Sequence, residues 1–325
     1  MKKNIAIIGG GDSPEYKISV KSAKQIIDII NKDKYNLFPV TIRKLDWKIE
    51  KPDGNHIPVD LRDFSLSGNN GKIRFDYAFI IIHGTPGENG LLQSYLDMQK
   101  VPYNTSGVLA SALSFNKYAC KIYLKNFDIL TAESIMLKRR QEYSESQVIE
   151  TVGLPCFVKP NNGGSSFGTS KVNKAEELGK AIEDAFAIDN EVIIESYVKG
   201  TELSCGLLKT KNEEIIFPVT EIVTINEFFD YEAKYTEGKA EEITPASVSE
   251  EIQKRCKQLS SEIYDYLNCR GIVRVDFILR GNQLYFLELN SVPGMTRESI
   301  IPKQIRAMGL NLEDIIEKVI EDTFS

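Results

Sequence analysis

Two apolar segments near the C-terminus are each interrupted by polar residues two positions apart. They read GIVRVDFIL (271–279) and QLYFLELN (283–290), and the RGN sequence between them is typical of a turn. The polar residues are Arg274, Asp276, Glu288 and Asn290. Side chains alternate along a strand, so each pair shares one face of the predicted hairpin. Burying an unpaired carboxylate is costly, and these acids therefore need a cationic or metal partner if the hairpin is buried.

The length of the turn decides which residues lie opposite each other. A three-residue turn at 280–282 places Arg274 opposite Glu288 and Asp276 opposite Phe286, and all four polar groups then share one surface. A turn of even length would place the two pairs on opposite faces. The first arrangement suits Mg²⁺ bound to phosphate, because Mg²⁺ prefers oxygen ligands and takes only one or two carboxylates. The hairpin alone leaves an exposed face with a surface salt bridge as an alternative.

Composition indicates a soluble globular protein. The 325 residues are 42% hydrophobic and 26% charged, which suits two or three domains. The apolar run AFIIIH (78–83) is too short to span a bilayer, and Gly and Asp stand where a signal peptide would carry its cleavage site. The net charge of −6 without a basic block argues against a nucleic-acid partner. Five scattered cysteines without a C-x-x-C pair argue against disulfides and a zinc site, and predict a cytoplasmic location.

The order of predicted elements indicates an α/β fold in three parts. A buried strand at 4–10 precedes a helical pattern, and strands and helices alternate up to 76–84, which favours a Rossmann-like parallel sheet. A helix is predicted over about 106–126, another near 174–187 and a third near 249–267. We divide the chain into residues 1–104, 105–195 and 196–325.

Two segments have the composition of phosphate-binding elements. VKPNNGGSSFGTS (158–170) places Lys159 before a run of glycines and serines whose N–H and hydroxyl groups can wrap an anion. It is not a Walker A motif, because no lysine follows the glycines. A flexible surface loop is an equally good interpretation of the segment alone. In FNKYACK (115–121), Lys117 and Lys121 share one helix face, a spacing that more often marks a solvated face.

A third segment has the layout of a nucleotide-binding connector. VIIESYVKGTELSCGLL (192–208) reads as strand, connector and strand, with Glu195 and Glu202 at the two ends of the connector. Backbone groups in such a connector suit an adenine edge, and a carboxylate suits ribose hydroxyls. An ordinary connector with exposed acids is the alternative.

Taken together, the motifs and their order resemble the D-alanine–D-alanine ligases, a family of the ATP-grasp superfamily. The resemblance runs from the first strand to the last helices, with GENG in place of the commoner G-E-D-G and FNK in place of M-D-K. It implies an N-terminal Rossmann-like domain followed by a two-domain ATP-grasp fold whose C-terminal part is α+β. The motifs are GGDSPEYKIS (10–19), HGTPGENG (83–90), Lys117, VKPNNGGSSFG (158–168), IESYVKGTE (194–202), DYEAKY (230–235), RVD (274–276) and ELNSVPGMT (288–296).

The resemblance also implies where ATP and metal bind. Phosphate contacts fall to Lys117 and Lys159, with the loop that contains Gly164 and Ser166 folded over them. The adenine pocket is lined by Glu195, Ser196 and Val198, and Glu202 holds the ribose. Asp276, Glu288 and Asn290 match the ligands of two Mg²⁺ (or Mn²⁺) ions, with Glu288 bridging them. A monovalent cation is a further candidate cofactor.

The family's reaction assigns roles to the remaining positions. One D-alanine carboxylate attacks the γ-phosphate of ATP to give an acyl phosphate, and the amine of a second D-alanine attacks its carbonyl. Arg274 and the Gly294 N–H match groups that stabilise the oxyanion. Glu15 matches the residue that holds the first ammonium, Ser299 and Ile300 match the second substrate site, and His83 matches an orienting residue. The dipeptide serves peptidoglycan precursor synthesis, and relatives are commonly homodimers.

The polar stretch 220–247 is long for a structureless connection and reads as a lid over the site. Within it, the resemblance makes Lys234 and Tyr235 lid residues, with Tyr235 bonded to Ser165 and Glu15. Relatives that ligate D-lactate lack this tyrosine arrangement, so its presence favours D-alanine as the second substrate.

Three other functions compete with this hypothesis. Another ATP-grasp ligase with a different acid or nucleophile would share the ATP and metal residues. An NAD-linked oxidoreductase is suggested only by Gly9 and Gly11, and Pro14 occupies the third glycine position of that fingerprint. An inactive nucleotide-binding module should have lost a metal ligand, and Asp276, Glu288 and Asn290 are all present.

Overall fold

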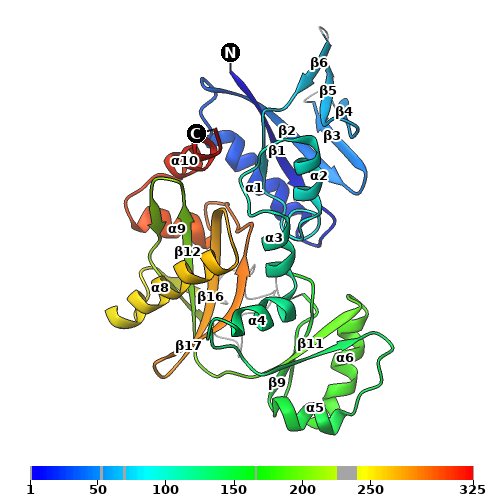
Figure 1. Cartoon of the computed structure of the whole chain (residues 1–325), viewed down its shortest axis with the longest axis vertical. Coiled ribbons are helices and arrows are strands. Elements are labelled where there is room, and N and C mark those ends of the chain that lie inside the picture. The colour runs from blue at the N-terminus through cyan, green and yellow to red at the C-terminus, as the bar shows by residue number, and fades with distance from the viewer. Residues whose placement is uncertain (1, 52–53, 69–70, 165–166, 225–239, 325) are drawn as a thin grey trace.

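The computed structural model describes residues 2–51, 54–68, 71–164, 167–224 and 240–324, which fold around three β-sheets (Figure 1). The N-terminal sheet lies at the top of the view, the sheet with α8 below it on the left, and the sheet with α5 and α6 at the bottom right. This mixed α/β architecture confirms the predicted fold class. In the described part of the chain, no helix is both long and apolar enough to cross a membrane.

The N-terminal sheet has a parallel centre and an antiparallel arm. Its order is β6-β5-β4-β3-β2-β1-β7, and β1 pairs in parallel with both β2 and β7, as the predicted sheet requires. The arm from β2 to β6 is antiparallel, which the sequence did not indicate. The elements are β1 (Lys3–Gly10), α1 (Tyr16–Ile29), β2 (Tyr35–Arg43), β3 (Asp46–Glu50), β4 (His56–Asp60), β5 (Ser65–Gly68), β6 (Gly71–Arg74), β7 (Tyr77–Ile80) and α2 (Leu91–Gln99).

The four-stranded sheet is antiparallel, with the order β10-β9-β11-β8. Two helices pack on it through apolar stripes, Val148 and Val152 from α5 and Leu178 and Ile182 from α6. Its elements are β8 (Ser134–Lys138), α5 (Glu145–Val152), β9 (Cys156–Pro160), β10 (Ser170–Val172), the 3₁₀ turn η1 (Ala175–Glu177), α6 (Leu178–Phe186) and β11 (Glu191–Ser196).

The third sheet follows the order β15-β14-β12-β16-β17, with β13 also paired to β12. The predicted helix at 249–267 is confirmed as α8, whereas the helix predicted over 106–126 is divided at Asn116. The elements are α3 (Val108–Phe115), α4 (Lys117–Lys125), β12 (Thr201–Lys209), β13 (Glu214–Ile216), β14 (Thr220–Thr224), β15 (Ala240–Ile243), α8 (Glu250–Tyr266), β16 (Gly271–Arg280), β17 (Gln283–Asn290), α9 (Ile300–Ala307) and α10 (Leu312–Phe324).

Two apolar cores join segments that are far apart in the chain. Cys120 and Leu124 of α4 pack with Leu203 of β12, so this helix belongs to the core of the third sheet. Ile316 and Ile320 of α10 pack with Ile5 of β1, and Figure 1 shows α10 returning to the N-terminal sheet. The division of the chain at residues 104 and 195 stays a prediction.

The register of the β16–β17 hairpin corrects the predicted turn. Arg280 pairs with Gln283, so the turn has two residues rather than three. A β-bulge between Asp276 and Phe277 shifts the register, since Phe277 pairs with Phe286 but Asp276 pairs with Glu288. Leu287 is thus the extra residue on β17, and it reverses the alternation that an even turn would impose. The bulge explains how the polar pairs share a face although the turn was predicted wrongly.

Candidate active site

The Asp276 carboxylate is the centre of a buried polar cluster on the third sheet. It accepts hydrogen bonds from Arg274 Nη2 at 2.7 Å, from Ser204 Oγ at 2.6 Å and from Asn290 Nδ2 at 3.1 Å. Burial lowers the pKa of Arg274, but the charge of Asp276 outweighs this effect and raises that pKa. The guanidinium is therefore a fixed positive charge beside a fixed negative one. This cluster is buried, so the alternative of an exposed surface salt bridge is wrong.

Glu288 lies opposite Asp276 across the hairpin, and its side chain is more exposed than that of Asp276. Its carboxylate lies 3.4 Å from Lys117 Nζ, which also donates to the carbonyl of Gly163 at 2.7 Å. Lys117 is the first residue of α4, and its own N–H donates to the carbonyl of Asn161. Lys117 therefore ties the loop after β9 to the hairpin of the third sheet.

A second ionic cluster lies on β11 and is buried. Glu195 accepts a hydrogen bond from Lys159 Nζ at 2.6 Å and forms a closer ion pair with Lys121. Burial alone would raise the pKa of Glu195, but the two lysines lower it to about 2. Lys121 is 2% exposed, so its interpretation as part of a solvated face is wrong. The helical spacing placed it correctly beside Lys117, but no local signal revealed a carboxylate on a distant strand.

Glu15, from the N-terminal part of the chain, lies beside Gly164 in the loop after β9. It precedes α1, is almost buried, and its Oε2 lies so close to Gly164 that a Cβ there would be 2.8 Å away. The absence of a side chain at Gly164 thus permits the approach of the serine-glycine loop to Glu15. Glu15, Lys117 and Glu288, which belong to separate motifs, therefore lie around the 163–164 segment.

His83 follows β7 and is buried between the N-terminal and third sheets. Its Nδ1 lies 2.9 Å from the carbonyl of Val292, and its backbone N–H donates to Ser19 Oγ. Burial lowers the pKa of His83, so the ring is neutral and Nδ1 carries the proton that Val292 accepts. Nε2 is buried without a partner among the described residues and has a lone pair to offer. His56, the other histidine, is exposed.

Glu88 is a buried carboxylate that the sequence reasoning did not single out. It accepts a hydrogen bond from the Gly84 N–H at 2.6 Å, which closes the loop after His83. Burial, helped by the charge of Glu15, raises its pKa to about 8. Its position within HGTPGENG was the available signal, since this motif carried the resemblance.

The turn after β17 contains the remaining predicted substrate positions. A Cβ on Gly294 would lie 2.8 Å from Ser299 Oγ, so the turn and the start of α9 are in contact. Ser299 precedes α9 and shares a hydrogen bond with Thr296 Oγ1 at 2.7 Å. Ile300 is the first residue of α9 and is buried.

The predicted adenine and ribose positions lie on and after β11. The Ser196 hydroxyl donates to the carbonyl of Val152, so this side chain has a structural partner. Val198 lies in the connector to β12, and Glu202 lies on β12 opposite Ile278 of β16. Ser165, Ser166, Lys234 and Tyr235 lie outside the described residues, as does most of the stretch predicted to be a lid.

Two family descriptions match this chain almost from end to end. "D-ala D-ala ligase N-terminus" matches residues 4–106, and "D-ala D-ala ligase C-terminus" matches residues 120–321. The chain belongs to the D-alanine–D-alanine ligase family. Among curated members, the D-alanine–D-alanine ligase of Bacteroides fragilis (strain YCH46) is 50% identical over 325 residues, 100% of both chains. That of Flavobacterium johnsoniae is 46% identical over 319 residues, 98% of both chains.

Solved structures of this ligase family have the same fold. The VanG D-Ala:D-Ser ligase of Enterococcus faecalis matches with a TM-score of 0.88 and 31% identity, over 99% of this chain and 100% of that one. The D-alanine–D-alanine ligase of Bacillus anthracis complexed with ATP matches with a TM-score of 0.80 and 28% identity, over 100% of this chain and 97% of that one.

Proposed function

We propose that the protein joins two D-alanine molecules into D-alanyl-D-alanine with ATP as the energy source, for peptidoglycan precursor synthesis. The carboxylate of the first D-alanine takes the γ-phosphoryl group and ADP leaves. The amine of the second D-alanine then attacks the acyl carbon, loses a proton and displaces phosphate. Family membership supports this reaction, and the curated relatives at 46% to 50% identity carry the corresponding name.

The observation that carries the proposal is the meeting of Glu15, Lys117 and Glu288 around the 163–164 segment. Lys117 contacts both Gly163 and Glu288, and Glu15 contacts Gly164. An ammonium-binding carboxylate, a phosphate-binding lysine and a metal-binding carboxylate are needed together when an amino acid meets a triphosphate. We assign the first substrate's ammonium to Glu15 and ATP phosphates to Lys117 and Lys159.

We assign the rest of the nucleotide to the β11–β12 connector. The backbone at Glu195, Ser196 and Val198 suits the adenine edge, and Glu202 suits the ribose hydroxyls. Glu195 also supports phosphate binding indirectly, because its hydrogen bond with Lys159 holds that ammonium in place. Gly164, with Ser165 and Ser166, is assigned to the loop over the phosphates.

We assign two Mg²⁺ (or Mn²⁺) ions to Asp276, Glu288 and Asn290. The donor set fits, because it provides two carboxylates and an amide oxygen on one face of the hairpin. Phosphate and water oxygens would complete the coordination of the bound ions. Bound metal would neutralise the charge of the triphosphate and polarise its γ-phosphoryl group.

The chain's own groups then act on the acyl carbon and the two amino acids. Arg274, with its permanently charged guanidinium, and the N–H of Gly294 are assigned to the developing oxyanion. Ser299 and Ile300, at the start of α9, are assigned to the second substrate. His83 is assigned to orienting substrate through Nε2, and Lys234 and Tyr235 to the closed site.

The direct test is phosphate release from ATP with D-alanine added, with the dipeptide identified by mass spectrometry. We expect release to depend on D-alanine and Mg²⁺ and to match the dipeptide formed in equal amounts. Phosphate release that D-alanine does not stimulate would reject the proposal and favour another ATP-grasp carboxylate–amine ligase.

A different second substrate is the alternative, since one of the matching structures is named a D-Ala:D-Ser ligase. Competition between D-alanine and D-serine or D-lactate, followed by product analysis, separates the two. D-alanyl-D-alanine as the main product at equal concentrations would support D-alanine at the second site.

We also propose a cytoplasmic homodimer. All five cysteines are free, which suits a reducing compartment. Leu91 and Met98 are exposed one heptad apart on α2, and they supply an apolar patch for a second copy. Light scattering of the protein tests the subunit number. Turnover with and without K⁺ in the activity buffer tests any role of a monovalent cation.

A further inference from the structure

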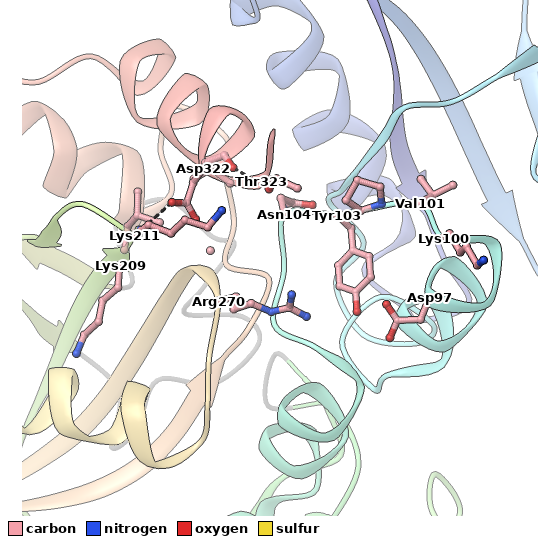
Figure 2. Close-up of a pocket in the computed structure, with 14 residues that line it drawn as sticks. Asp97, Lys100, Val101, Tyr103, Asn104, Lys209, Lys211, Arg270, Asp322 and Thr323 are labelled. Atoms are coloured by element: carbon pink, nitrogen blue, oxygen red, sulfur yellow. Dashed lines mark hydrogen bonds between the residues drawn. The ribbon is translucent and has the colours of Figure 1, made fainter. Parts of the chain in front are cut away.

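A cleft of about 450 Å³ lies between the N-terminal and third sheets, away from the proposed active site (Figure 2). One wall is the segment from Asp97 to Asn104, and the other contains the end of β12, the start of β16 and the end of α10. None of the residues assigned above to ATP, metal or amino acid lines it. Its volume lies in the range of small-molecule sites.

The charged side chains around the cleft are predominantly cationic. They are Lys100, Lys209, Lys211, Arg270, Asp97 and Asp322. Lys209 is paired with Asp265 at 2.8 Å, and Figure 2 shows its ammonium and that of Lys100 directed away from the centre. Lys211 and Arg270, in contrast, extend their charged ends into the space between the two walls.

Tyr103 packs against Arg270 in the same cleft. Its side chain is 8% exposed, and the Arg270 guanidinium lies 5.7 Å from its ring centroid. The Tyr103 hydroxyl is buried, and Asp97 and Arg270 flank it. Burial and the nearby Asp97 raise the pKa of Tyr103 to about 12, so the hydroxyl keeps its proton. Because solvent does not reach this hydroxyl, Arg270 is the polar group beside it that a ligand can contact.

We propose that this cleft binds a small organic phosphate, whose oxygens accept hydrogen bonds from Arg270 and Lys211. A phosphomonoester has three terminal oxygens and close to two negative charges, which match two cationic side chains. Arginine suits phosphate because its planar fork donates two parallel bonds. The apolar side chains of Val101, Leu208 and Val319 line the same cleft and would contact the organic part.

Both walls of the cleft are connected to segments that carry residues of the proposed active site. Arg270 immediately precedes β16, which carries Arg274 and Asp276. On the opposite wall, the Asn104 side chain bonds both the N–H and the carbonyl of Ile80, three residues before His83. A bound organic phosphate would therefore contact both walls, one through Arg270 and the other through Val101. This inference goes beyond the proposed function and does not depend on it.

Calorimetric titration of the full-length protein, with the nucleotide site saturated by ADP and Mg²⁺, tests the proposal. The probe is glycerol 2-phosphate, and glutarate serves as a dicarboxylate of similar size. We expect saturable binding of the phosphate that weakens about tenfold or more in Arg270→Gln and in Lys211→Gln. Arg280→Gln is the matched control, because Arg280 is exposed at the other end of β16.

Three binding results would overturn the proposal. They are the absence of saturable phosphate binding, equal binding by Arg270→Gln, and glutarate binding as tight as that of the phosphate. A changed subunit number in Arg270→Gln would assign the cleft to a subunit contact and overturn it as well. Arg270 and Lys211 are exposed, so these variants should fold, and unchanged D-alanine-dependent turnover would confirm that. If the wild-type protein showed no D-alanine-dependent turnover, that result would contradict the proposed function and not the phosphate site.

Discussion

Lys121 and Glu195 form an ion pair in which the two side chains are only 2% and 3% exposed. The residues are 74 positions apart, one on α4 and the other on β11. Glu195 bonds Lys159 with its other oxygen, so one carboxylate connects two lysines. We infer that Lys121 is a positioning residue, which acts on the nucleotide through Glu195 and Lys159.

Replacing Lys121 with methionine should leave Glu195 with one cation and weaken the fixation of Lys159. Removing one partner of a buried ion pair destabilises a protein by about 3–5 kcal/mol, so the melting temperature should fall. The KM for ATP should rise more than kcat falls, because Lys121 does not contact the reacting atoms. Lys125→Met, on the exposed part of the same helix, is the control and should change neither value. A wild-type KM for ATP in Lys121→Met would contradict the positioning role.

Glu288→Gln should reduce turnover by about 100-fold or more, because an amide is a weaker metal ligand than a carboxylate. Glu288 is partly exposed, so circular dichroism and the melting temperature should stay close to those of the wild type. Glu298→Gln removes a carboxylate with 78% side-chain exposure and should keep normal activity. Near-normal turnover by Glu288→Gln would reject the metal assignment.

Arg274→Lys keeps a positive charge beside Asp276 but loses the bidentate geometry of the guanidinium. If Arg274 stabilises the oxyanion, kcat should fall by about 10²–10³ while the KM values for ATP and D-alanine change little. Steady-state kinetics with each substrate varied in turn provide the test. A rise in the KM for ATP with an unchanged kcat would instead place Arg274 in nucleotide binding.

The raised pKa of Glu88 predicts a pH-dependent stability. The folded protein holds a proton on Glu88 up to about pH 8, whereas the unfolded chain releases it near the ordinary pKa of 4.5. Between these values the native state binds more protons, so this group's contribution to the free energy of unfolding falls as pH rises. Glu88→Gln removes the titration and can keep an acceptor for Gly84. Its stability relative to the wild type should therefore increase from pH 5 to pH 8.5.

Chemical denaturation of both proteins across this pH range measures the effect. The difference in the free energy of unfolding between Glu88→Gln and the wild type should change by a few kcal/mol over the range. Since His83 and all other groups titrate in both proteins, their contributions cancel. Parallel stability curves would show that Glu88 is not protonated in the folded state.

The motifs of this chain were sufficient to predict its family and the hairpin. The reason is local: strand alternation and helical spacing decide which side chains share a face, and the order of motifs was specific. Lys117 contacts Glu288 and Lys159 contacts Glu195, and their roles towards ATP stay predictions. The predicted strands and the helix at 249–267 followed from the same periodicities.

Only the tertiary structure decided what those faces contact. The bulge at Leu287 reverses the alternation of β17, and no local pattern distinguishes it from a longer turn. Lys121 is buried because β11 brings Glu195 to it, although its spacing alone is that of a solvated face. Arg270 and Tyr103 form one cleft because α10 and β16 pack beside the end of the N-terminal sheet. The sequence determines local periodicity and chemistry, whereas burial and partners depend on long-range packing, which a single segment does not contain.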